Sequence, residues 1–246
     1  MYMDQYFSEM KKVLEKIEKT QRENIIKAAD YVVESITNDG MWYIIDTGHM
    51  LMHEAVGRTG GMMAIRPIKI NCEINNPTRY RDSGGRKKIS YDMVPGFPEF
   101  VLSQCNIRQG DVLIIGSVSG YNNLPVQLAL AARSMGVKTI GITSVEYSSK
   151  LKSVHPSSLR LFEAVDVVLD NCTNYSDTLV HVPELDRGIC PASGIAASYL
   201  IWALQSTVVE KLIRKGLTPS VYISNHMPNA AVINSEAWKH YEENGY

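Results

Sequence analysis

The chain has 246 residues, of which 45% are hydrophobic, and its formal net charge is -1. This length suits one α/β domain with a sizeable core, and a charge so close to zero argues against attraction to nucleic acid or to an anionic membrane. The sequence shows neither the basic start and apolar run of a secretory signal nor an apolar stretch long enough to cross a bilayer. The four cysteines are scattered without a C-x-x-C pair, which is typical of a reducing compartment. We therefore expect a cytoplasmic, soluble enzyme or binding protein.

The N-terminal part is predicted to be helical. Apolar residues recur at helical spacing over 5–36, as one long helix or two in tandem, and Asn38-Asp39-Gly40 ends the pattern. Residues 42–45 form a short apolar run that predicts a buried strand. The segment 49–56 that follows is predicted to be a helix.

The next segments predict a second strand and a long loop. Residues 62–70 favour a strand, and Pro67 within it indicates an edge position or a break. Residues 75–96 are polar and basic and rich in turn residues, which indicates a long surface loop. A helix over 97–106 follows.

The clearest prediction is a strand–helix–strand unit. Residues 112–115 predict a buried strand, 124–135 a helix with Gly136 as its stop, and 137–142 the next strand. Such a unit implies a parallel sheet with a right-handed crossover. The remaining expected elements are a strand at 165–169, a long and nearly all-apolar helix at 193–214, a short strand at 221–224 and a closing polar helix.

The segment DVLIIGSVSGYNN, residues 111–123, predicts an anion site. Ligands of parallel sheets bind beyond the carboxyl ends of the strands, and a helix begins just after this end with unpaired N–H groups. Ser117 and Ser119 add hydroxyls, Gly120 allows close approach of the backbone, and Asn122 and Asn123 add amides. An ordinary helix cap is the alternative, and it explains one or two of these five residues. We interpret the segment as a neutral cradle for a phosphate.

Known nucleotide motifs are missing from the sequence. It contains no G-x-x-x-x-G-K-[ST] pattern, and neither Gly48 nor Gly116 starts a G-x-G-x-x-G pattern. No Arg or Lys stands in the cradle. We therefore expect a monophosphate on a small metabolite, and no cofactor.

The stretch GSVSGYNNLPVQLALAARSMGVKTIGITS resembles the signature of the SIS (sugar isomerase) domain, with strand, S-x-S-G, helix and second strand in register. GHMLMHEAVGRTGG, HPSSLRLFEAVDVVLDN and SNHMPN resemble uncharacterised stand-alone SIS proteins of bacteria. The resemblance covers most of residues 20 to 230. It implies an α/β fold, a three-layer α/β/α sandwich around a five-stranded parallel sheet, in a homodimer or homotetramer. One SIS domain would span 1–246, with a helical segment 1–37, a core 38–228 and a C-terminal helix 229–246.

The resemblance also implies which residues bind the phosphosugar. The phosphate role passes to the side chains of Ser117, Ser119 and Asn122 and to the backbone of Val118 and Gly120. Three further hydroxyls are candidates: Thr143 and Ser144 at the end of the next strand, and Ser193 at the start of the long apolar helix.

The loop after the first strand departs from the family pattern. SIS domains usually have G-x-G-x-S there, whereas this chain has Asp46-Thr47-Gly48-His49-Met50. The expected serine is missing, so Thr47 and Gly48 are the sugar-binding candidates of this loop.

Glu54 is the first candidate for a catalytic base. Aldose–ketose isomerisation moves a proton between neighbouring carbons and needs a positioned carboxylate or imidazole. Sugar isomerases and etherases of the superfamily often carry a glutamate just after this loop, which is an implication of the resemblance. The alternative is a surface ion pair with Arg58 at i+4.

Histidines supply the other candidates. His49 and His53 stand at i and i+4, a spacing that can hold a metal, but the motif lacks the internal glutamate of H-E-x-x-H. We expect His49 to face the ligand and no metal to bind. His155 is a candidate for ring opening, or else a turn histidine packed on Pro156. His226 is a candidate to reach a neighbouring subunit's site.

We expect a phosphosugar-binding SIS protein, most simply an isomerase of a sugar phosphate or amino-sugar phosphate. A phosphosugar lyase or etherase and a non-catalytic sensor acting through a partner protein are the alternatives. A DNA-binding regulator is not expected, because about 40 residues precede Trp42, too few for both a helix-turn-helix domain and the first SIS helix, and the charge is not basic. The expected partners are the small-molecule phosphosugar and further copies of the chain, with no nucleic acid and no membrane.

Overall fold

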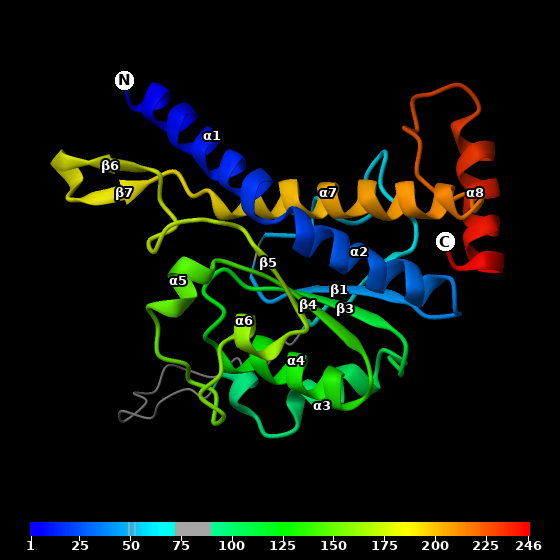
Figure 1. Cartoon of the computed structure of the whole chain (residues 1–246), viewed down its shortest axis with the longest axis horizontal. Helices are drawn as coiled ribbons and strands as arrows, with labels where there is room; N and C mark the ends of the chain where they lie inside the picture. The colour runs from blue at the N-terminus through cyan, green and yellow to red at the C-terminus, as the bar shows by residue number, and fades with distance from the viewer. Residues whose placement is uncertain (49, 52, 72–89) are drawn as a thin grey trace, which may run out of the picture.

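A computed structural model describes residues 1–48, 50–51, 53–71 and 90–246 (Figure 1). His49 and most of the predicted 75–96 loop lie outside the described residues. Within the described ranges, no helix combines the length and the apolarity needed to cross a membrane.

The centre of the fold is a five-stranded parallel sheet in the order β2-β1-β3-β4-β5. Its strands are β1 (Trp42–Asp46), β2 (Ile65–Pro67), β3 (Val112–Gly116), β4 (Lys138–Thr143) and β5 (Val167–Asp170). The register aligns Gly116 with Asp46 on one side and with Ile142 on the other. The carboxyl ends of β1, β3 and β4 therefore lie side by side, and the predicted parallel sheet is confirmed.

Helices cover both faces of the sheet, as Figure 1 shows. One face carries α1 (Tyr2–Thr20), α2 (Arg22–Ile36) and α7 (Ser193–Arg214); the other carries α3 (Phe97–Ser103), α4 (Asn123–Ser134) and the short α6 (Leu161–Ala164). Alternation of side chains along the buried strands separates the two cores: Ile44 and Ile114 face the first layer, whereas Ile45 and Ile115 face the second. The three-layer sandwich is thereby confirmed, with the bounds of α7 as predicted.

Smaller elements complete the chain. They are α5 (Val145–Ser149), α8 (Ala230–Asn244), two 3-10 turns at Tyr91–Met93 and Pro183–Leu185, and the antiparallel hairpin β6 (Val180–Val182) and β7 (Arg187–Ile189). Figure 1 shows the hairpin beside the start of α1, beyond the end of the sheet. The Tyr2 hydroxyl donates a 2.9 Å hydrogen bond to Glu184 there.

The predicted helix over 49–56 is wrong for the residues that the structure describes, which form bends and turns. The Asp46 carboxylate accepts the N–H groups of Gly48 (3.0 Å) and Leu51 (2.7 Å), and this bends the chain back over the end of β1. Among the described residues, only a single turn follows, in which the Leu51 carbonyl accepts from Glu54 N–H (3.2 Å) and Ala55 N–H (2.9 Å), before Gly57 adopts φ +67°.

Two strand predictions are corrected in length. The strand expected over 62–70 is only the three residues of β2, at the sheet edge where Pro67 was expected to place it. The strand expected over 221–224 is a single antiparallel bridge between Val221 and Met62.

Candidate functional site

The strand order places a crevice between β1 and β3. From β1 the chain passes to β2 on one side, whereas β3, β4 and β5 continue on the other side. The loops that leave β1 and β3 therefore diverge at this point, which is where open parallel sheets bind ligands. These are the first loop, residues 47–51, of which 49 is not described, and the second loop, residues 117–122.

The first loop is tied to the end of β3. The backbone N–H and the hydroxyl of Thr47 both donate to the Gly116 carbonyl at 3.0 Å. Gly116 permits this approach, because a Cβ there would lie 2.7 Å from Leu51 Cδ1 and 3.0 Å from Asp46 Oδ1. Thr47 is thus held against the start of the second loop, although its hydroxyl already has an acceptor.

The second loop is anchored from behind through its carbonyl groups. The Val118 carbonyl accepts from Ser144 N–H and from the Thr143 hydroxyl, both at 3.0 Å. The Gly120 carbonyl accepts from Leu161 N–H at 2.7 Å. Because the carbonyls face protein donors, the loop can turn its N–H groups outward.

Several donors of the second loop are unused. Toward the residues that the structure describes, the N–H groups of Val118, Ser119 and Tyr121 form no hydrogen bond, and neither does the Ser119 hydroxyl. Gly120 N–H is the exception, since it donates to Ser117 Oγ at 3.2 Å. Backbone N–H groups without a protein acceptor at the end of a strand are suited to bind an anion.

The second loop leads into the N-terminus of α4. Asn122 is exposed and holds the N-cap position in an extended conformation, but its side chain makes no capping hydrogen bond. The first N–H groups of a helix have no intrahelical acceptor and carry the positive end of the helix dipole. The predicted cradle residues Ser117, Ser119, Gly120 and Asn122 are therefore brought together here.

A cavity of about 400 Å³ opens beside these loops. Its polar lining comes from Asp46, Thr47, Gly48, His53, Lys69 and Asn71, and its apolar lining includes Ile68, Tyr91 and Leu124. Sequence reasoning missed Lys69 and Asn71. The available signal was their position just after an edge strand, where polar side chains alternate with Ile68 and Ile70.

Three predicted hydroxyls have partners within the fold. Thr143 donates to Val118 as described, and the buried Ser144 donates to the Thr173 carbonyl at 2.7 Å while it caps α5. Ser193 is buried at the start of α7, where its hydroxyl donates to Asp177 Oδ2 at 2.5 Å. The structure therefore gives each of them a role in the fold, and their contact with a ligand stays a prediction.

His155 is buried, and both of its ring nitrogens have partners. Nδ1 accepts the Ser157 N–H at 3.1 Å, so Nε2 carries the proton and donates to Gln127 Oε1 at 2.6 Å. Burial lowers the pKa of His155 below its ordinary value, and the nearby Glu99 carboxylate opposes that shift. His155 lines a different hollow, together with Glu99 of α3 and Gln127 of α4.

The two remaining described candidates, Glu54 and His226, both lie away from the lining of the 400 Å³ cavity. Glu54 forms an ion pair with Arg58 at 3.3 Å, as its alternative interpretation expected, and it is not among the described residues that line the 400 Å³ cavity. His226 is exposed on the loop before α8. The described residues contain no group of three or more histidine, cysteine, aspartate or glutamate side chains placed to hold a metal ion.

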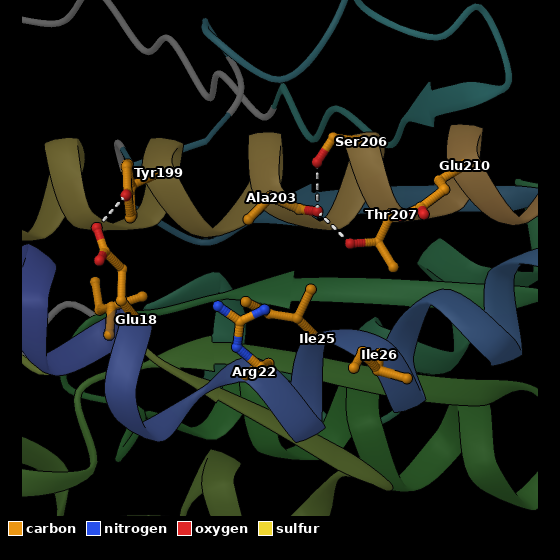
Figure 2. A pocket seen from close by; sticks show the side chains of 10 residues that line it. Glu18, Arg22, Ile25, Ile26, Tyr199, Ala203, Ser206, Thr207 and Glu210 are labelled. Carbon is orange, nitrogen blue, oxygen red and sulfur yellow. Dashed lines mark hydrogen bonds between the residues drawn. The ribbon is translucent and has the colours of Figure 1, made fainter.

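A second hollow lies away from the sheet edge, between α1–α2 and α7 (Figure 2). Its volume is about 280 Å³, and the Tyr199 hydroxyl closes one end by donating to Glu18 at 2.5 Å. In Figure 2, Arg22 and Ile25 point from α2 toward α7. None of the described site candidates lines this hollow, whereas Thr47 and Gly48 line the cavity beside the two loops.

Comparison with known proteins adds independent evidence. The family model of the SIS domain matches residues 5–144. A UPF0309 protein of Listeria innocua is 30% identical over 234 residues, which are 94% of this chain and 92% of that protein. A UPF0309 protein of Geobacillus thermodenitrificans is 30% identical over 243 residues, 98% and 95% of the two chains.

A solved structure from Bacteroides fragilis, provisionally assigned as a phosphosugar isomerase involved in capsule formation, aligns with a TM-score of 0.50 at 18% identity. The alignment covers 88% of this chain and 91% of that one, and at this identity it shows the fold alone. The family model, in contrast, spans more than half of the sequence, including both loops of the crevice. The chain therefore belongs to the SIS domain family.

Proposed function

We propose that this protein binds the phosphate group of a phosphosugar on the second loop and isomerises the sugar between its aldose and ketose forms. The observation that carries the proposal is the loop at 117–122. Its Val118 and Gly120 carbonyls are anchored by protein donors, while the Ser119 hydroxyl and the N–H groups of Val118, Ser119 and Tyr121 have no acceptor among the described residues. A phosphate oxygen is the acceptor that such donors at a helix N-terminus select.

The adjoining cavity supports a sugar as the rest of the ligand. A sugar ring presents apolar C–H faces and polar hydroxyl edges, and the cavity offers both kinds of wall. Tyr91, Ile68 and Leu124 supply apolar surface, whereas Thr47 and Asn71 supply polar groups. Its volume of about 400 Å³ lies within the range of small-molecule sites.

We propose Glu54 as the base that moves the proton between the two carbons. Its carboxylate follows the first loop, and a bound sugar would compete with Arg58 for it, since the ion pair is exposed on both sides. Exposed ion pairs stabilise proteins little, so the carboxylate can exchange partners at small cost. His53 is the second candidate, because its imidazole lines the cavity directly.

A thermal-shift screen tests the binding step. Pentose, hexose, heptose and amino-sugar phosphates are compared with the same sugars without phosphate. At a ligand concentration of about 100 times Kd, native-state binding adds about 2.7 kcal/mol, which for a chain of this size raises Tm by roughly 5–10 °C. We expect a shift that requires the phosphate, and Ser119→Leu should abolish it in a folded protein.

Ser134→Ala is the matched control, because Ser134 lies at the other end of α4 and bonds only its own helix among the described residues. It should keep the shift. Isomer analysis of each bound sugar phosphate then separates an isomerase from a sensor, and Glu54→Gln should keep binding while it loses turnover. Turnover that survives Glu54→Gln and disappears in His53→Gln would move the base to His53. An unchanged Tm shift in Ser119→Leu would refute phosphate binding by the second loop.

A further inference from the structure

The segment that follows β2 contributes a lysine to the wall of the cavity. Lys69 and Asn71 are exposed and both line the cavity, while Ile68 between β2 and Lys69 is buried in the core beneath α3 and α4. Ile68 and Ile70 line the cavity as well, so the whole segment 68–71 forms this wall, and Lys69 and Asn71 are its exposed polar side chains. An ammonium and a carboxamide therefore face the ligand space from the edge of the sheet.

Lys69 has no anionic partner within the described part of the chain. Arg66, three residues earlier, shows the contrast: its guanidinium lies over the rings of Trp238 and Tyr241, at 5.4 and 5.8 Å from their centroids. Arg66 therefore has a structural role in attaching α8, whereas nothing described neutralises Lys69. A cation that lines a concave cavity and has no anionic partner among the described residues is suited to an anionic ligand.

Asp46 does not provide that neutralisation, although it lines the same cavity. One of its oxygens accepts the Gly48 N–H and the other accepts the Leu51 N–H. The carboxylate thus serves to shape the first loop. No ion pair joins it to Lys69 among the residues that the structure describes.

In the proposed function, the second loop binds a phosphate without help from Lys69. It supplies hydroxyls, backbone N–H groups and the α4 N-terminus, and contains no cation of its own. The cavity begins next to this loop, since Leu124 in the first turn of α4 and Thr47, which bonds Gly116, both line it. A sugar held by its phosphate on the loop would thus extend toward Lys69 with a different part of the molecule.

We propose that the ligand carries a second negative group, a carboxylate or a second phosphate, and that Lys69 binds it with Asn71. This inference rests on the proposed function and narrows its substrate class to acidic phosphosugars. Lys69 is then a specificity-determining residue, which selects these ligands over neutral sugar monophosphates.

Isothermal titration calorimetry with matched ligands tests the inference. For each carbon skeleton that binds, the aldose phosphate is compared with the same aldose phosphate carrying a carboxymethyl ether on one hydroxyl, which keeps the aldehyde, and with the bisphosphate. We expect one of the two acidic ligands to bind about tenfold tighter than the neutral one, as charge-assisted hydrogen bonds are the strong ones. Which of the two gains affinity identifies the second group.

Lys69→Met should remove that gain and leave the affinity for the aldose phosphate unchanged. Lys215→Met, a change in an exposed lysine that ends α7, is the control and should behave as the wild type. Equal losses for neutral and acidic ligands would overturn the inference, because Lys69 would then serve the first phosphate. Absence of any gain for acidic ligands would overturn it as well and leave the proposed function intact. If no sugar phosphate binds, the proposed function and the inference on Lys69 are both wrong.

Discussion

Gly120 is the residue on which the shape of the second loop, residues 117–122, most depends. Its φ is +56°, and a Cβ at this position would lie 2.9 Å from the Thr143 hydroxyl oxygen, which bonds the Val118 carbonyl. Gly120→Ala therefore combines a left-handed backbone penalty with a clash against the group that anchors the loop. We expect it to lower the free energy of unfolding by about 2–4 kcal/mol, measured by urea denaturation.

Gly216 provides the matched control for that substitution. Its φ is +77°, yet no atom lies within 4 Å of where a Cβ would be. Gly216→Ala should cost only the backbone penalty, about 1–2 kcal/mol. The difference between the two variants measures the steric part at Gly120. Equal losses would contradict the close packing of Gly120 against Thr143.

Single residues differ in how well their roles could be predicted from the sequence. Ser117, Ser119 and Asn122 lie within one six-residue segment before a recognisable helix, so one motif predicts them together. Lys69, two residues after the end of β2, lines the neighbouring cavity, and only the folded sheet edge shows this. A serine near the sheet edge, such as Ser193, has the same sequence pattern whether its partner is a ligand or the Asp177 carboxylate.

At the scale of elements, helices and strands with a long apolar pattern were predictable, and segments shaped by one side chain were not. The bounds of α7 follow directly from its apolar run over Ser193–Arg214. The segment after β1 has helical spacing too, but the Asp46 carboxylate accepts hydrogen bonds from two of its N–H groups and bends it. Local side-chain bonds of this kind compete with helix formation, and spacing alone does not reveal them.

The N-terminus of α7 depends on Asp177, which lies on the loop before β6. Its carboxylate accepts the N–H groups of Ala192 (3.2 Å) and Ser193 (2.9 Å). Asp177→Ala should reduce the free energy of unfolding by about 1–2 kcal/mol, since a helix start loses its acceptor and a negative charge. The urea midpoint, at unchanged m, measures the loss.

Asp177→Asn is the conservative counterpart. An amide oxygen still accepts a hydrogen bond, and asparagine tolerates the φ of +51° at this position. Its loss should be smaller than that of Asp177→Ala. If Asp177→Ala is as stable as the wild type, the loop before β6 does not support α7.

At the scale of the whole molecule, the parallel type of the sheet was predictable, because buried apolar runs alternate with helices. The hairpin β6–β7 was not predicted, since each of its strands has only three residues. The segment between α5 and α6 has no regular pattern either, and it places His155 against Gln127 of α4. His155 therefore links a connecting segment to α4, the helix that follows the second loop.

This link makes the stability of the whole molecule depend on pH. Burial lowers the pKa of folded His155, so the unfolded chain binds more protons, and stability must fall as the pH falls below the unfolded value of about 6.5. Protonation would also place an N–H at Nδ1, opposite the Ser157 N–H that this atom now accepts. Tm measured from about pH 7.5 to about pH 5.5 should therefore decrease more in the wild type than in His155→Gln. His226→Gln, a change in an exposed loop histidine, should keep the wild-type dependence. An equal decrease in His155→Gln would show that other groups set the acid sensitivity.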